Sequence, residues 1–176
     1  MSEMIEQPPR TIMEVYKMLP EGTLAELINN TIYRSPSPVR QHQRLATHLT
    51  SLLNLFVTDN NLGEVYAAPF DVYLDETSNA VQPDIIFVAT ENLGIIRHHI
   101  HGVPDLVVEI LSDGSRDHDT NKKKILYEKF GVKEYWIIDP QTKEAIGFEL
   151  QNGAYIEFYK MVGSIQSKLL QHTFQF

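Results

Sequence analysis

The spacing of apolar residues predicts three helices along the chain. Apolar positions recur at helical spacing over residues 11–19, 39–57 and 120–130. The second segment follows the chain break Ser35-Pro-Ser-Pro38, and Gly131 follows the third, where a left-handed residue commonly ends a helix. Each segment carries one apolar stripe, so each helix is expected to bury one face.

Short apolar runs predict the strands. Two runs, residues 84–88 and 105–111, are apolar on both faces and are therefore expected to be central strands. Other strands are indicated by period-two alternation or by flanking turn residues, and these are residues 24–33 (a hairpin that turns at Asn29-Asn30), 64–74, 134–139, 145–150, 155–161 and 169–176.

The order of these elements predicts an α+β or mixed α/β protein built on a mixed sheet. No internal repeat, low-complexity tract or interior linker divides the sequence, so residues 1–176 are expected to form a single domain. Residues 1–10 carry acids and prolines, and we expect them to be loosely ordered.

Composition and charge narrow the classes of function. The chain has no cysteine, which excludes disulfide scaffolds, thiolate zinc sites and cysteine nucleophiles. No apolar run could span a bilayer and the N-terminus lacks a secretion signal, so no membrane partner is expected and the expected location is cytoplasmic. With 15 Lys and Arg against 23 Asp and Glu, the net charge is −8, so nucleic acid would need a local basic patch or bridging metal ions.

Carboxylates occur on both predicted central strands. Asp84 stands at the head of one, and Glu109 lies within the apolar run of the other. Burying such a group is costly unless it is paired, protonated or bound to a cation, although Glu109 could instead reach solvent or an arginine near the strand end. Asp105 lies four residues before Glu109, about 13 Å along a regular strand. Asp84 is therefore the favoured partner of Glu109, and Asp105 is the second choice.

The third predicted helix aims one lysine at the core. Lys123, Leu126 and Tyr127 fall on a single stripe at 100° per residue. Lys123 either reaches past the first turn to water or, beside two strand carboxylates, holds a water and stabilises charge on an oxyanion. Asp119 is a candidate N-cap of this helix. Tyr127 is expected to pack in the core with its hydroxyl bonded to a carboxylate.

Two strand carboxylates with an adjacent ammonium group form a site of hard oxygen donors. Such donors suit Mg²⁺, or Mn²⁺ in its place, and both favour phosphate as a further ligand. A metal ion bound there polarises a phosphate group and lowers the pKa of a water, while the lysine helps to orient that water. This combination of groups indicates phosphodiester hydrolysis.

Several motifs surround these residues in an order that resembles a known family. They are Ala25-Glu-Leu-Ile28, Ser35-Pro-Ser-Pro38, His42-Gln-Arg44, Gln82-Pro-Asp-Ile85, Pro104-Asp-Leu-Val-Val-Glu-Ile-Leu-Ser112, Asp119 with Lys123 and Tyr127, and Gly131-Val-Lys-Glu-Tyr-Trp-Ile-Ile-Asp-Pro140. The ordered set resembles the Uma2 (Uma-two) family of restriction-endonuclease-like proteins in the PD-(D/E)xK nuclease superfamily. The resemblance implies a metal-dependent nuclease with a mixed central sheet flanked by helices.

Carried over by position, the resemblance assigns the metal-binding acids to Asp84 and Glu109 and the catalytic lysine to Lys123. It also places Glu26 near the metal. His42 and Gln82 are supporting candidates, and His42 either contacts phosphate or lies on the surface of its helix.

The sequence departs from the superfamily pattern at two points. Leu111 stands where the superfamily motif has its lysine. The resemblance implies that Lys123, on the following helix, takes the place of that lysine. The turn Ser112-Asp-Gly-Ser115 also differs from the family's usual Ser-Pro-Ser-Thr.

These observations favour an Mg²⁺-dependent endonuclease that acts on DNA as a homodimer. Arg116, Lys122 and Lys124 form a basic patch bordering the proposed site and are candidates for binding the substrate. One alternative is a catalytically silent member of the same fold that binds nucleic acid or protein. Another is a phosphoesterase that acts on small molecules.

Overall fold

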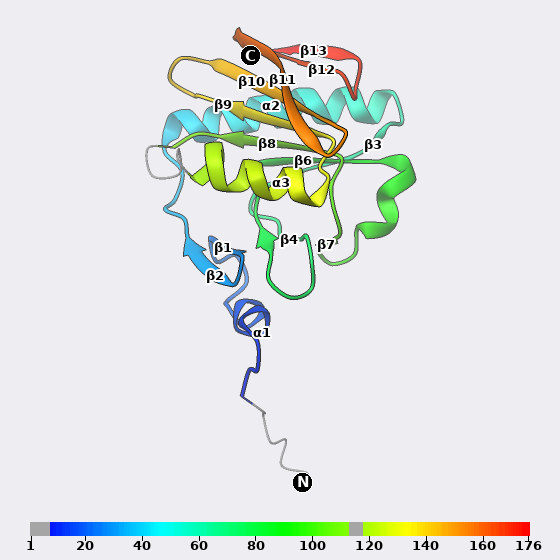
Figure 1. Cartoon of the computed structure of the whole chain (residues 1–176). Coiled ribbons are helices and arrows are strands. Elements are labelled where there is room, and N and C mark those ends of the chain that lie inside the picture. The colour runs from blue at the N-terminus through cyan, green and yellow to red at the C-terminus, as the bar shows by residue number, and fades with distance from the viewer. Residues whose placement is uncertain (1–7, 113–117) are drawn as a thin grey trace.

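A computed structural model of the chain describes residues 8–112 and 118–176, although the side chains of residues 118 and 119 are outside the description. The expectation for residues 1–10 therefore lies largely outside the described residues. The architecture is a mixed α+β fold, as the element pattern predicts. It has mixed β-sheets flanked by helices (Figure 1).

A six-stranded mixed sheet forms the centre of the structure. Its strands, in spatial order, are β11 (Ala154–Val162), β10 (Glu144–Gln151), β9 (Glu134–Ile138), β8 (Leu106–Ile110), β6 (Ile85–Ala89) and β3 (Gly63–Ala67). Only β8 and β9 are parallel neighbours among these described strands. The crossover that joins this pair contains the π-helical turn η2 (His118–Lys123) and the helix α3 (Lys124–Phe130), which ends at Gly131 in the left-handed conformation.

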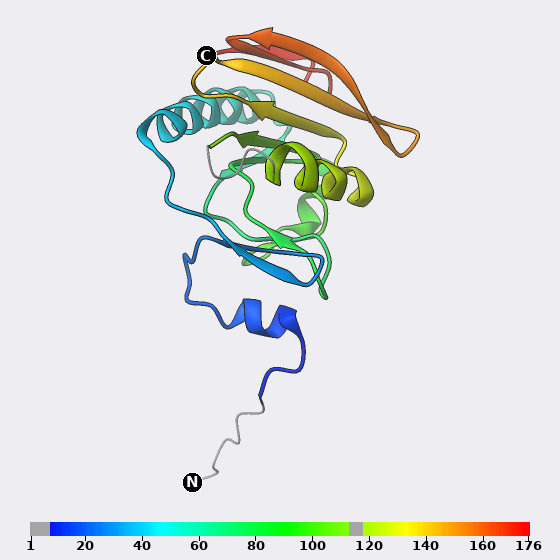
Figure 2. The same cartoon turned by 60° about the vertical axis from the view of Figure 1, so that its left-hand side comes forward.

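A second sheet lies on the α3 side of the first. Its strands, in spatial order, are β2 (Thr31–Arg34), β1 (Ala25–Ile28), β5 (Ala80–Val81), β4 (Val72–Tyr73) and β7 (Ile100–His101). The β1–β2 hairpin is the predicted one, and Asn29 and Asn30 both take positive φ at its turn. Figure 2 shows the helix α1 (Ile12–Lys17) on the outer side of this sheet.

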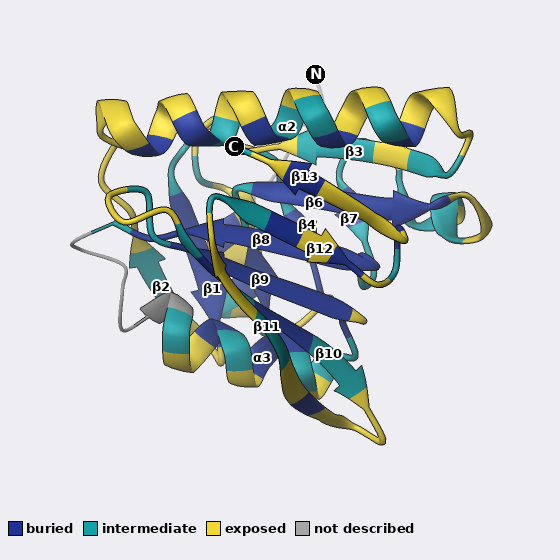
Figure 3. Ribbon diagram, turned by 90° about the horizontal axis from the view of Figure 1, so that it is seen from above, coloured by how far each residue is buried: buried dark blue, intermediate teal, exposed yellow. Residues whose placement is uncertain are grey.

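Two hydrophobic cores pack against opposite faces of the six-stranded sheet. The long helix α2 (Arg40–Asp59) and the hairpin of β12 (Ser164–Ser167) and β13 (His172–Gln175) cover one face. The other face packs against α3 and the second sheet. Every residue of β6, β8 and β9 is buried, and for β6 and β8 this confirms the central strands that their apolar runs predict (Figure 3).

The predicted elements differ from those of the structure in several places. The strand expected over residues 64–74 is divided into β3 and β4 by a segment that contains the cis peptide Ala68–Pro69. The short strands β5 and β7, the strand β12 and the 3₁₀ helix η1 (Thr90–Ile95) have no counterpart among the predicted elements. The sequence of β12 has one apolar residue, Ile165, between polar neighbours, which is too short a pattern to identify a strand.

A buried carboxyl group fastens the β12–β13 hairpin to the central sheet. Glu134 on β9 accepts hydrogen bonds from the indole of Trp136 at 2.6 Å and from the backbone of Leu169 at 2.8 Å. Burial raises the pKa of Glu134, although these donors oppose the shift. The turn of the hairpin is thus attached to a fully buried strand.

None of the helices in the described ranges is long and apolar enough to cross a membrane.

Gly147 on β10 leaves space for the Trp136 indole. A Cβ atom at residue 147 would lie 2.6–2.9 Å from three ring atoms. Gly147→Ala should therefore displace the indole and lower the free energy of unfolding by about 1–3 kcal/mol, measured by urea unfolding followed by tryptophan fluorescence. Gly94→Ala is the control, because a Cβ there meets no atom within 4 Å. Equal losses in both variants would contradict this account of the packing.

Candidate functional site

The predicted acids and lysine lie near the end of β8, where the second sheet and the crossover helix approach the central sheet. Glu109 is the fourth residue of β8 and is 2% exposed. Its neighbours Val108 and Ile110 pack in the core on the α2 side, so the strand alternation directs Glu109 to the α3 side. The alternative that Glu109 reaches solvent is therefore wrong.

Lys123 links two carboxylates from different sheets. Its Nζ lies 2.8 Å from Oε1 of Glu26 on β1 and 3.0 Å from Oε1 of Glu109. Lys123 is 5% exposed and Glu26 is 3% exposed, so the group is almost completely shielded from water. Lys123 thus lies on the buried stripe that its spacing indicates and does not extend to the surface. We call Glu26, Glu109 and Lys123 the buried ion triad.

Tyr127 supports the triad from the next turn of the same helix. Its hydroxyl donates a 2.7 Å hydrogen bond to Oε1 of Glu109, the oxygen that also contacts Lys123. Burial, reinforced by the negative charges of Glu109 and Glu26, raises the pKa of Tyr127 well above its ordinary value. The hydroxyl is therefore protonated at neutral pH and can donate its hydrogen bond to Glu109.

Asp84 lies next to Glu109 across two neighbouring strands but has different hydrogen-bond partners. Ile85 pairs with Val108, so the register brings Asp84 beside Glu109 on the adjoining strand. The Asp84 carboxylate accepts a hydrogen bond from the backbone of Ile110 at 2.7 Å, and its Oδ2 lies 3.2 Å from Nε2 of His42. His42 is 7% exposed, so the alternative of a surface histidine is wrong.

Within residues 8–112 and 118–176, no three His, Asp or Glu side chains form a group that could hold a metal ion. Mg²⁺ commonly takes one or two protein carboxylates and completes its shell with water and substrate phosphate. Asp84 and Glu109 together supply the one or two hard carboxylate oxygens that such an ion takes from a protein, so this pair fits the ion chemically.

Gln82 joins the triad to a second polar group that the sequence analysis missed. Its backbone N–H donates to Oε1 of Glu26 at 2.9 Å, and its side chain donates to Asp71 Oδ1 at 2.9 Å and to the carbonyl of Thr23 at 3.1 Å. Tyr16 on α1 also donates to Asp71, at 2.8 Å. No local pattern distinguishes Asp71 from other acids, because its role depends on contacts between distant segments.

The predicted basic patch is described only in part. Lys122 lies over the ring of Tyr33 at 4.8 Å from its centroid, and Lys124 lies over the ring of Phe148 at 3.9 Å. Arg116 and the side chain of Asp119 lie outside the described residues. The N-cap expectation for Asp119 therefore stays a prediction.

Asp105, the second choice for the acidic pair, occupies the opposite end of β8. Its carboxylate accepts hydrogen bonds from the backbone of Ala89 at 2.8 Å and from the amide of Asn92 at 2.7 Å, and it pairs with Lys133 at 2.7 Å. Burial acts to raise its pKa, but these donors outweigh burial and lower it below the ordinary value. Asp105 therefore holds the connection between β6, η1 and β9.

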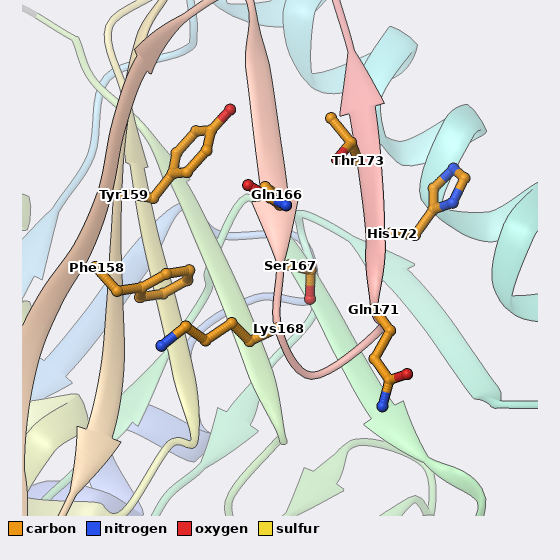
Figure 4. A pocket seen from close by; sticks show the side chains of 8 residues that line it. All are labelled: Phe158, Tyr159, Gln166, Ser167, Lys168, Gln171, His172 and Thr173. Atoms are coloured by element: carbon orange, nitrogen blue, oxygen red, sulfur yellow. The ribbon is translucent and has the colours of Figure 1, made fainter.

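An open groove of about 730 Å³ lies between β11 and the β12–β13 hairpin, away from these acids (Figure 4). None of its lining residues was predicted to belong to the site. Within it, Lys168 is held by Glu149 at 2.7 Å and lies over the ring of Phe158.

Comparisons with known proteins agree with this fold. It resembles the crystal structure of "a putative nuclease belonging to DUF820 from Anabaena variabilis ATCC 29413", with a TM-score of 0.70 and 21% sequence identity, over 85% of this chain and 84% of that chain. The fold is thus that of the restriction-endonuclease-like proteins. A family model described as "Uma2: Putative restriction endonuclease" matches residues 12–168. The chain belongs to the Uma2 family. No curated protein gives a significant match.

The Tyr127 hydroxyl should contribute more stability than a comparable neutral hydrogen bond. Tyr127→Phe removes a donor to a carboxylate and is expected to lower the free energy of unfolding by about 1.5–3 kcal/mol. Tyr155→Phe is the matched control, because the Tyr155 hydroxyl donates to the backbone carbonyl of Val132 at 2.9 Å, and a loss of about 0.5–1.5 kcal/mol is expected. Urea unfolding measures both losses. A larger loss in Tyr155→Phe would contradict the importance of the Glu109 contact.

Asp105 should make stability depend on pH. Its pKa lies below the ordinary value of 3.8 in the folded state, so its contribution is present above that pH and is lost as the pH falls through the folded-state pKa. At pH 7, the free energy of unfolding of Asp105→Asn is expected to be about 1–3 kcal/mol lower than that of the unchanged protein. Urea titrations should show that the difference in the free energy of unfolding between the variant and the unchanged protein becomes smaller below pH 4. A difference that stays constant with pH would exclude this explanation.

Proposed function

We propose that the protein is a metal-dependent endonuclease that hydrolyses phosphodiester bonds in DNA. The observation that carries this proposal is the buried ion triad, in which an ammonium group lies between two shielded carboxylates beside a third acid, Asp84. A purely structural core rarely retains so many ionisable groups, whereas phosphoryl-transfer sites require them. Membership of the Uma2 family supports the same reaction class.

Asp84 and Glu109 are the residues proposed to hold Mg²⁺ or Mn²⁺, with Glu26 next to them. When bound, such an ion supplies a water of lowered pKa and polarises a phosphate oxygen. The protein positions its carboxylates for this role with separate donors. The backbone of Ile110 holds Asp84, Tyr127 holds Glu109, and the backbone of Gln82 holds Glu26.

Lys123 is the proposed cation beside the reacting phosphate. Its ammonium group can donate hydrogen bonds both to an attacking water and to a phosphate oxygen that gains negative charge. Low exposure to water strengthens these interactions. His42 holds the carboxylate of Asp84 from the α2 side and is proposed to maintain its orientation.

Binding of the DNA backbone is assigned to the basic residues at the rim, Lys122 and Lys124, together with Arg116. The first two can move from their aromatic rings to phosphate groups at small cost, because an exposed cation–π contact is worth only about 0.5–1 kcal/mol. A homodimer is also proposed, because two sites can cut both strands of a duplex in one binding event, whereas a single site must cut them one after the other. We also propose that it acts in the cytoplasm, with no membrane partner.

The proposal is tested by plasmid cleavage with the isosteric variants Asp84→Asn and Glu109→Gln and with Lys123→Met. Each variant should reduce Mg²⁺-dependent cleavage by about 100-fold or more, because each removes a charge from the reacting centre. Asp105→Asn is the control, since Asp105 lies at the other end of β8 and its loss should leave cleavage near the unchanged rate.

Circular dichroism establishes that each variant is folded before its activity is compared. Cleavage that survives chelation of divalent ions, or that is equal in all four variants, would disprove the proposed reaction. A protein that binds DNA without cleaving it under any metal condition would instead be the silent binding module.

A further inference from the structure

We infer that the Lys123 ammonium group and a divalent cation compete for one position, the gap between the carboxylates of Glu26 and Glu109. This inference rests on the proposed function and concerns how the same site accepts its metal. It assigns to Lys123 a role that precedes catalysis, because the ion proposed to be held by Asp84 and Glu109 could also bind Glu26 only after the lysine has left the gap.

The two carboxylates are close enough together to share one cation. Oε1 of Glu26 and Oε1 of Glu109 lie 2.8 and 3.0 Å from the same nitrogen, so they can be no farther apart than the sum of these distances, about 5.8 Å. A hard divalent ion binds carboxylate oxygens at about 2.0–2.6 Å, so two oxygens that share it lie about 3–5 Å apart, closest when they are adjacent in its shell and farthest when they are opposite. The ammonium group thus holds the acids within a small side-chain adjustment of the spacing that an ion needs.

Each carboxylate is positioned independently of Lys123. The backbone N–H of Gln82 donates to Glu26, and the hydroxyl of Tyr127 donates to Glu109. Both donors are neutral and belong to buried or partly buried parts of the structure. Movement of Lys123 would therefore leave two oriented carboxylates behind, which is the arrangement that a cation site requires.

Electrostatics makes the competition strong. Two carboxylates in a shielded site need positive charge between them, and either a lysine or a metal ion can supply it. Both cannot occupy the gap, because a single and a double positive charge about 4 Å apart repel each other strongly at low dielectric constant. The lysine has a long flexible side chain and stands at the junction of the π-helical turn η2 with α3, so it can change rotamer while the helix stays in place.

The experiment measures binding of Mn²⁺ alone, without substrate, to chelator-treated protein by calorimetry and by thermal unfolding. Lys123→Met keeps the length of the side chain and removes its charge. We expect the variant to bind Mn²⁺ at least about 10-fold more tightly than the unchanged protein. Without metal, we expect the variant to unfold at a lower temperature than the unchanged protein. Saturating Mn²⁺ should raise the unfolding temperature of the variant more than that of the unchanged protein, because the ion replaces the missing ammonium group.

Two control variants make the result specific. Lys133→Met removes an ammonium group from a single buried carboxylate, Asp105. It should therefore lower the unfolding temperature, and Mn²⁺ should not raise that temperature again. The double variant Lys123→Met with Glu26→Gln should lose the tighter binding, because only one carboxylate of the gap then remains charged.

A second measurement uses the unchanged protein, in case Lys123→Met does not fold. Lys123 is 5% exposed and should react slowly with an amine-acetylating reagent. Mn²⁺ should accelerate acetylation of Lys123, detected by peptide mass spectrometry, and should leave Lys168 unchanged. Protection of Lys123 that is the same with and without bound Mn²⁺ would overturn the competition.

The outcomes also separate this inference from the proposed function. Equal or weaker Mn²⁺ binding by Lys123→Met, in a protein that binds the metal and cleaves DNA, would overturn the competition alone. Absence of both Mn²⁺ binding and cleavage in the unchanged protein would overturn the inference and the proposed nuclease together.

Discussion

The central constraint in this structure is the need to neutralise two carboxylates that are shielded from water. Glu26 lies on the second sheet and Glu109 on the central sheet, and Lys123 contacts both from the crossover helix. An ion pair of this kind can contribute little net stability, because desolvation offsets the attraction, yet loss of one member leaves a buried charge at a cost of about 3–5 kcal/mol. The triad therefore fixes the relative placement of three elements more than it strengthens the fold.

The same constraint explains why the polar contacts extend well beyond the triad. Glu26 is held by Gln82, whose side chain is held in turn by Asp71, and Asp71 also accepts a hydrogen bond from Tyr16 of α1. Because Gln82 is two residues before Asp84, these bonds restrain the segment that carries the third acid. The N-terminal helix is thus connected through side chains to the candidate site, although α1 itself packs on the outer side of the second sheet.

The sequence predicts the repetitive parts of the fold well and the site in part. Central strands, the α2 stripe and the buried face of Lys123 follow from periodicity, because burial acts on residues at fixed spacing. Periodicity cannot identify Asp71, whose partners are 11 and 55 residues away in the chain. It also misses β12, which has one buried apolar residue flanked by polar ones.

A net charge of −8 and a nucleic-acid substrate are compatible only if positive charge is concentrated where the phosphate enters. The buried triad offers a reason for such concentration, since it gathers carboxylates that attract cations of either kind, ammonium groups or metal ions. Lys122 and Lys124 belong to the same helical segment as Lys123, and each lies over an aromatic ring of a neighbouring strand. Each side chain thus covers apolar surface and keeps its charge. Under the proposed function, the acids at the centre would bind the metal ion and the cations at the rim would bind the phosphate, so that a net acidic chain could still hold nucleic acid at this one place.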